Sequence, residues 1–170
     1  MGYKWWKNLD SPFDVKQALL EIVDIFHFVL SDSIINGVDA EQIYNTYLWS
    51  IKHTHAPTKE KKIQMVEEFV ASLVDSETTS YLAQFFIVVH CLDISIESVL
   101  KYYVGKNALN LFRQDNGYKQ GTYKKIWTYE GLIAEDNKFL ENIIEGIDGP
   151  FVPNDVYYEL SHIYNYKESE

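Results

Sequence analysis

Residues 18–31 read ALLEIVDIFHFVLS, and this stretch decides the fold. Apolar side chains surround it almost completely, which is typical of a helix buried in a core. One narrow polar line, made of Glu21, Asp24, His27 and Ser31, runs along it at steps of three, three and four. Two carboxylates in apolar surroundings are costly unless cations compensate them. The stretch therefore predicts helical oxygen ligands for Mg²⁺ at Glu21 and Asp24.

A simpler interpretation of the same pattern is a solvated helix face. For an arbitrary E-x-x-D, a solvated face is favoured by roughly ten to one, because charged groups are seldom fully buried. Here the flanking residues favour the metal site, since no broad polar face exists to which the acids could belong. His27 taken alone is more typical of a hydrogen-bonded core histidine than of a ligand.

The composition favours a single folded domain over residues 1–170. Hydrophobic residues make up 46% of the chain, enough for a sizeable core. The formal net charge of −10 disfavours binding to nucleic-acid polymers or to anionic membranes. Cys91 is the single cysteine, which indicates a reducing compartment. The first residues lack the apolar segment of a signal peptide, so we expect a cytoplasmic location and no membrane span.

Helical periodicity and capping residues predict an all-α bundle of about seven helices. Ser11-Pro12 is expected to open the helix around residues 18–31, Asn36-Gly37 to close it, and Asp39 to cap the next one. The β-branched residues of 81–92 are also compatible with a strand, but no partner strand is evident. The remaining helices are expected around residues 43–51, 63–73, 81–92, 95–117, 139–147 and 154–164.

Basic residues concentrate in residues 101–125, which hold six of them and one acid, Asp115. Lys106, Asn110 and Arg113 lie at steps of four and three, so they point together on a helix. Arg113 is the only arginine in the chain. The loop after Gly117 is rich in lysine, and such loops are usually just solvated. Directly after an aligned Lys/Asn/Arg face, this loop is better suited to bind phosphate.

Two further fragments receive a structural interpretation. YKWWK at residues 3–7 alternates aromatic rings with lysines. By itself this fragment favours an amphipathic anchor over stacking on a nucleobase. His53 and His55 stand in a polar connection without nearby acids, and we assign them no metal role.

Residues 18–31 and 105–127 together resemble the dimeric, all-α dUTP diphosphatases, a branch of the all-α nucleoside-triphosphate pyrophosphohydrolases. The WKN element at residues 6–8 and the triplet Glu135-Asp136-Asn137 resemble the same family. The resemblance implies hydrolysis of dUTP to dUMP and pyrophosphate with Mg²⁺. It also implies a homodimer in which each active site is shared between the subunits.

The resemblance assigns roles to individual residues. Glu21 and Asp24 match the second acidic pair of the family and are the expected catalytic metal ligands. Trp6 and Phe28 match aromatic residues close to the uracil, and Lys106, Asn110, Arg113, Lys119 and Lys125 match nucleotide and phosphate residues. Lys7, His27 and Tyr118 are further expected substrate-binding residues.

One departure from the family pattern leaves alternatives open. The family has an E-x-x-E helix just upstream of the tryptophan-lysine element, and this chain starts at that element, like an N-terminally truncated member. Three readings follow. The chain is an Mg²⁺-dependent dUTP diphosphatase, a pyrophosphohydrolase for another nucleotide, or a helical nucleotide-binding or protein-interaction module that has lost catalysis.

Overall fold

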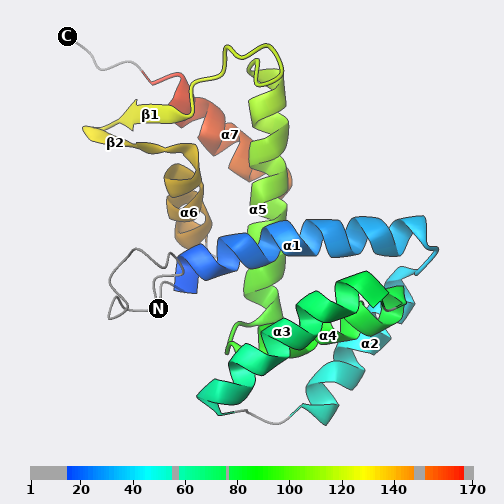
Figure 1. Cartoon of the computed structure of the whole chain (residues 1–170). Helices are drawn as coiled ribbons and strands as arrows, with labels where there is room; N and C mark the ends of the chain where they lie inside the picture. Colours follow the sequence, from blue (N-terminus) through cyan, green and yellow to red (C-terminus); the bar gives the residue numbers. More distant parts are fainter. Residues whose placement is uncertain (1–14, 55–57, 76, 148–151, 167–170) are drawn as a thin grey trace. The chain divides into compact units, whose positions relative to one another are not determined.

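The computed structural model describes residues 15–54, 58–75, 77–147 and 152–166 (Figure 1). The chain divides into two compact units, Met1–Val99 and Leu100–Glu170, and each is described by itself. The elements of the described residues are α1 (Val15–Ile35), α2 (Ala40–His53), α3 (Lys59–Asp75), α4 (Thr78–Cys91), α5 (Ile96–Asp115), β1 (Ile126–Tyr129), β2 (Leu132–Glu135), α6 (Asp136–Gly146) and α7 (Pro153–Tyr164).

The prediction of an all-α fold with about seven helices is confirmed. The structure also contains one small β-hairpin that was not predicted. Strands β1 and β2 pair antiparallel, with Trp127 opposite Ala134. The turn between them places Glu130 at φ 48° and Gly131 at φ 77°, and two successive positive φ values match the right-handed twist of a hairpin. The sequence signal was short: the β-branched and aromatic residues of β1, IWTY, are followed by Glu130-Gly131, and each strand has only four residues.

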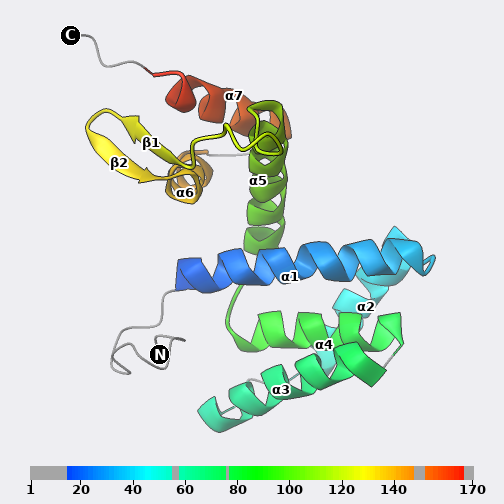
Figure 2. The ribbon, with the colours of Figure 1, turned by 45° about the horizontal axis from the view of Figure 1, so that its top comes forward.

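Helix α4 is the centre of the first unit and lies between α1 and α3 in Figure 2. Its Phe85 ring stacks on Phe26 of α1, with centroids 5.0 Å apart, and its Phe86 ring meets Tyr47 of α2 at 5.4 Å. Phe69 of α3 lies 6.1 Å from the same Phe85 ring. Half of the residues in α4 are buried, so α4 joins the other three helices of this unit.

The prediction that residues 18–31 are buried on nearly every face is wrong. Leu19, Val23 and Phe26 are buried against the core, but Phe28 is 77% exposed and Ile35 is 82% exposed. Helix α1 packs on α4, and its buried side chains include Leu20, Ile22 and Val29 as well, while Ile25, Phe28 and Ile34 are exposed. High apolar content therefore did not make α1 the central helix.

The predicted helix ends are confirmed where the structure describes them. The Asp39 side chain accepts from the backbone N–H of Gln42, whose side chain accepts from Asp39 in return. Gly37 at φ 74° and Gly117 at φ 89° each end a helix, α1 and α5, because this left-handed conformation lets the following amides reach back to the last carbonyls. Ser11-Pro12 lies outside the described residues.

An aromatic cluster forms the core of the second unit. Phe112 of α5 is 1% exposed and contacts the rings of Tyr123, Trp127, Tyr157 and Tyr164 at centroid distances of 5.3–6.4 Å. Trp127 also stacks on Phe139 of α6, 5.7 Å away. The cluster therefore fastens the loop after α5 and the hairpin to helices α5, α6 and α7.

The helices of the described residues were compared with the length and apolar content that a membrane span requires. None of them is both long and apolar enough to cross a membrane alone, and only α4 and α5 taken together as a bent pair pass by length and composition.

Candidate functional site

The two acids on α1 are more accessible than their sequence surroundings suggest. Glu21 is exposed and Asp24 is half-buried, one helical turn apart. The expectation of carboxylates enclosed by apolar side chains is therefore wrong, and the polar line as a whole is exposed at Glu21 and Ser31 and half-buried at Asp24 and His27. The accessible position leaves both side chains within reach of a solvated ligand.

The donor set on α1 fits Mg²⁺ only in part. Among the residues that the structure describes, no group of three or more His, Cys, Asp or Glu side chains is arranged to hold a metal ion. Two carboxylates are nevertheless sufficient for Mg²⁺ when water and substrate phosphate oxygens complete the octahedral shell. Glu21 and Asp24 therefore match a metal that arrives together with a nucleotide.

His27 and Phe28 follow the acids on α1 and differ in exposure. The Nδ1 atom of His27 lies 2.8 Å from the carbonyl oxygen of Val23, so its half-buried ring is oriented by its own helix. The Phe28 ring is 77% exposed, and such a ring offers a flat apolar face to a ligand.

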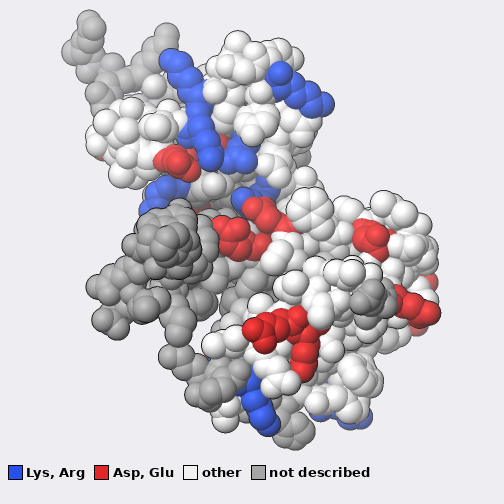
Figure 3. Space-filling model, viewed as in Figure 1, with Lys and Arg blue, Asp and Glu red and all other residues white. Residues whose placement is uncertain are grey.

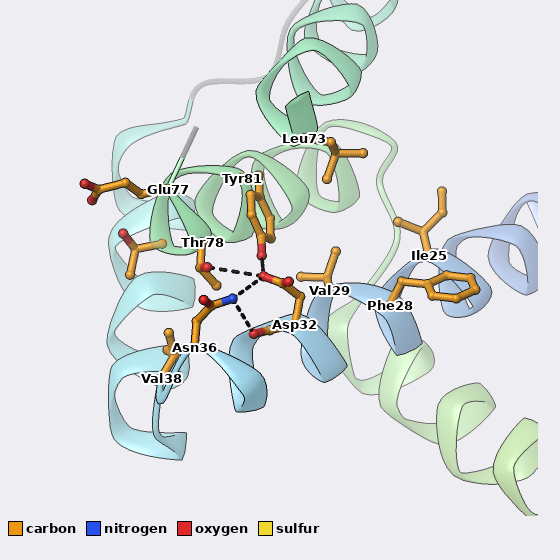
Figure 4. A pocket seen from close by; sticks show the side chains of 11 residues that line it. Ile25, Phe28, Val29, Asp32, Asn36, Val38, Leu73, Glu77, Thr78 and Tyr81 are labelled. Carbon is orange, nitrogen blue, oxygen red and sulfur yellow. Dashed lines mark hydrogen bonds between the residues drawn. The ribbon is translucent and has the colours of Figure 1, made fainter. Parts of the chain in front are cut away.

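A cavity of about 910 Å³ opens beside Phe28 within the first unit (Figure 4). One side is apolar, with Ile25, Phe28 and Leu73. The other side is polar, where Oδ2 of Asp32 accepts hydrogen bonds from Asn36 at 2.8 Å, from Thr78 at 3.2 Å and from Tyr81. Sequence reasoning missed this polar cluster, although Asp32 stands one turn beyond Phe28 and could have been noted.

Arg113 of the second unit is turned toward a buried carboxylate. Its Nε donates to Oδ2 of Asp136 at 2.8 Å, and its Nη2 donates to Oδ1 of the same residue at 2.8 Å. The Arg113 side chain is 14% exposed and that of Asp136 is 0% exposed. This two-point pairing connects α5 to the first turn of α6.

Asp136 accepts two further hydrogen bonds, from the Tyr123 hydroxyl and from the backbone N–H of Asn137, both at 2.8 Å. Burial lowers the pKa of Arg113, but the hydrogen bond and charge of Asp136 outweigh it and leave this pKa raised. Burial, and next the hydrogen bond to Asp136, raises the pKa of Tyr123. The cluster therefore keeps Arg113 charged and Tyr123 neutral at physiological pH.

Asn110 and Arg113 are hydrogen-bonded to each other on α5, whereas Lys106 is buried. Nη1 of Arg113 donates to Oδ1 of Asn110 at 3.2 Å. Lys106 is only 6% exposed. The aligned face is thus less open than its spacing implies, because Lys106 is buried and the Arg113 side chain is 14% exposed.

The remaining predicted site residues of the second unit lie in the loop that follows α5. Tyr118 is 58% exposed and Lys119 is also exposed. Nζ of Lys125 lies 3.5 Å from the Glu135 carboxylate, with both side chains open to solvent. On the face drawn in Figure 3, most lysine and arginine side chains lie over the second unit. Trp6 and Lys7 lie outside the described residues.

Comparison with known proteins gives one family. The sequence model described as dUTPase matches residues 1–118 of the chain. The matched range includes α1 to α5 and ends within the turn after Gly117, so Lys119, Lys125 and Asp136 lie beyond it. No curated protein matches the chain.

Proposed function

The chain belongs to the dUTPase family, and from this premise we propose that it hydrolyses dUTP to dUMP and pyrophosphate. A water molecule adds to a phosphorus of the triphosphate and the bond to the pyrophosphate oxygen breaks. The observation that carries the proposal is the family match over residues 1–118, which contains the acids of α1 and the Asn110–Arg113 pair.

Glu21 and Asp24 are proposed to hold Mg²⁺ and thereby to carry the chemistry. Their hard oxygen atoms and accessible position support this role. When bound, the metal supplies charge neutralisation of the phosphates and activation of water. Because two carboxylates alone form a weak site, we expect poor Mg²⁺ binding until a nucleotide adds phosphate oxygens.

Five residues of the second unit are proposed to bind the phosphates. Hydrogen-bond donors directed at a phosphoryl group stabilise the charge that develops during its transfer. Asn110, Lys119 and Lys125 reach solvent, while Lys106 and Arg113 are largely buried and contribute positive charge near the surface. Tyr118, which is exposed beside Lys119, is proposed to contact the nucleotide as well.

Phe28 is proposed to stack on the base, and Trp6, Lys7 and His27 are proposed to bind the nucleotide as well. The exposed ring of Phe28 supports this role, because stacking requires one free face. A pyrophosphohydrolase for another nucleotide would use the same acids and phosphate donors. A comparison of dUTP with the other nucleoside triphosphates therefore belongs to the test.

The proposal is tested by pyrophosphate release from dUTP with Mg²⁺. We expect Glu21→Gln to lower the rate by about a hundredfold or more, because it removes one metal oxygen charge. Glu41→Gln, at an exposed position in the first turn of α2, serves as the control and should keep the rate. Nucleotide binding without any release by the wild-type chain would favour the non-catalytic module. Faster release from another triphosphate would change the substrate.

We further propose that the chain forms a homodimer. The supporting observation is a row of exposed apolar side chains on α3, at Ile63, Val66, Val70, Leu73 and Val74, with exposures of 39–80%. Such a row is unusual on the free surface of a monomer. Sedimentation should show a dimer at micromolar concentration that Val70→Lys disrupts. Gln64→Lys on the polar side of α3 is the matched control.

A further inference from the structure

The Asp136 cluster leaves Arg113 with little freedom. Nε and Nη2 of the guanidinium both point at the buried carboxylate, and Nη2 also lies 3.5 Å from Oδ1 of Asn137. Only Nη1 is directed elsewhere, toward Oδ1 of Asn110 at 3.2 Å. A guanidinium carries five N–H groups in a fixed plane, so one N–H of Nη1 remains for a ligand.

The contact with Arg113 also fixes the amide of Asn110. Because Oδ1 accepts from Nη1, the contact with Arg113 does not use the two N–H donors of the Asn110 amide nitrogen. Asn110 is half-buried and lines a cavity of about 290 Å³ within the second unit, together with Asn107 and Gln114. Its donors therefore have access to a ligand.

We infer that Asp136 is a positioning residue for phosphate binding. Its carboxylate fixes the guanidinium of Arg113, and Arg113 fixes the amide of Asn110, so that Nη1 of Arg113 and Nδ2 of Asn110 remain as the donors for a phosphate oxygen. The inference rests on the proposed function, because it requires a phosphate-bearing ligand at this face. It adds a residue that lies beyond the range matched by the family.

The competing arrangement is one in which phosphate displaces Asp136 and takes the whole fork of Arg113. That exchange would leave a carboxylate of 0% exposure without its cation, and an uncompensated buried charge is strongly unfavourable. Tyr123 and the backbone of Asn137 also hold Asp136 in place from other directions. The geometry therefore favours a ligand at Nη1 while Asp136 stays on Nε and Nη2.

Nitrogen NMR can separate these arrangements, because Arg113 is the only arginine and its side-chain signals are unambiguous. The chain is labelled with ¹⁵N-arginine and titrated with α,β-imido-dUTP and Mg²⁺. We expect separate Nη1 and Nη2 signals in the free chain, and a ligand-induced shift of Nη1 with Nε and Nη2 nearly unchanged. A shift of Nε as large as that of Nη1 would overturn the inference.

Binding by variants supplies the second test. Asp136→Glu keeps the charge but moves the carboxylate, and it should weaken binding of α,β-imido-dUTP by about tenfold. Tyr123→Phe removes one hydrogen bond to Oδ2 of Asp136 and should weaken binding by about threefold. Tyr157→Phe is the matched control, because Tyr157 donates at the same distance, 2.8 Å, to the exposed Asp115.

The outcomes distinguish the two proposals. If the wild-type chain does not bind the analogue, the proposed function fails and the positioning role fails with it. If the wild-type chain binds and both Asp136→Glu and Tyr123→Phe bind equally well, only the inference fails. Should Asp136→Glu not fold by circular dichroism, Tyr123→Phe against Tyr157→Phe decides the question.

Discussion

Both units have an aromatic core, but they differ in where they place their charged side chains. The first unit is held by phenylalanine rings around α4, and its acids on α1 lie exposed or half-buried. The second unit also has an aromatic core, but it places an ion pair inside, between Arg113 and Asp136. Helix α1, although strongly apolar, thus leaves Glu21 exposed and Asp24 half-buried. The basic segment of residues 101–125, in contrast, buries most of the Arg113 side chain.

This difference separates two uses of a charged residue. An exposed carboxylate costs little to place, whereas a buried one depends on its hydrogen-bonding and charged partners. Of the acids on α1, Glu21 and Asp24 are therefore the ones we propose as ligands of a metal that binds with its nucleotide. Asp136 is suited to hold other side chains in place.

The largest expected effect contrasts two rings of α1. Phe26→Ala should lower the free energy of unfolding by about 4 kcal/mol, because the Phe26 ring is buried against Phe85. Phe28→Ala should change it by less than about 0.5 kcal/mol, because that ring is exposed. Urea denaturation measures both. Equal losses would show that α1 is buried on both faces.

The next effect contrasts the ion pairs of the two units. Asp136→Asn should lower the free energy of unfolding by about 3 kcal/mol, because it leaves Arg113 without its buried partner. Asp93→Asn removes the partner of Lys62 in the first unit, where the Asp93 side chain is 83% exposed, and should have no measurable effect. Comparable urea midpoints for the two variants would contradict this difference.

A smaller effect is expected at the glycines that end α1 and α5. Gly117→Ala should cost about 2 kcal/mol, since a new Cβ would meet Oγ1 of Thr122 in addition to the strain of φ 89°. Gly37→Ala, at φ 74° with open space around it, should cost about 1 kcal/mol. Thermal unfolding of both variants tests whether the loop after α5 is packed more tightly than the turn after α1.

The smallest effect depends on pH. The pKa of Tyr123 is raised in the folded chain from an ordinary value of 10.0. The stabilisation of the folded chain by the neutral Tyr123 hydroxyl is therefore fully present below pH 10. Above that pH the phenol of the unfolded chain ionises first, and stability falls by up to about 1 kcal/mol per pH unit. Tyr123→Phe should show a shallower loss in urea titrations between pH 9.5 and about 11. Parallel curves would contradict the assignment.

Most of the fold could be predicted from local pattern. Periodicity predicted seven helices, and Asn36-Gly37, Asp39 and Gly117 marked ends that the structure confirms. The hairpin was missed because each strand has four residues and one exposed face. Burial was predicted poorly at Phe28 and Lys106, since it depends on which neighbours cover a helix and how far they extend.

The sequence by itself determined the helices, their ends, the family, and which residue types could bind metal and phosphate. These properties follow from backbone preferences and from spacing along a single helix. Only the tertiary structure decided that α4 is the central helix and that Arg113 faces Asp136, 23 residues away in sequence. The physical reason is that burial and ion pairing arise between elements distant in the chain, where spacing within one helix carries no information.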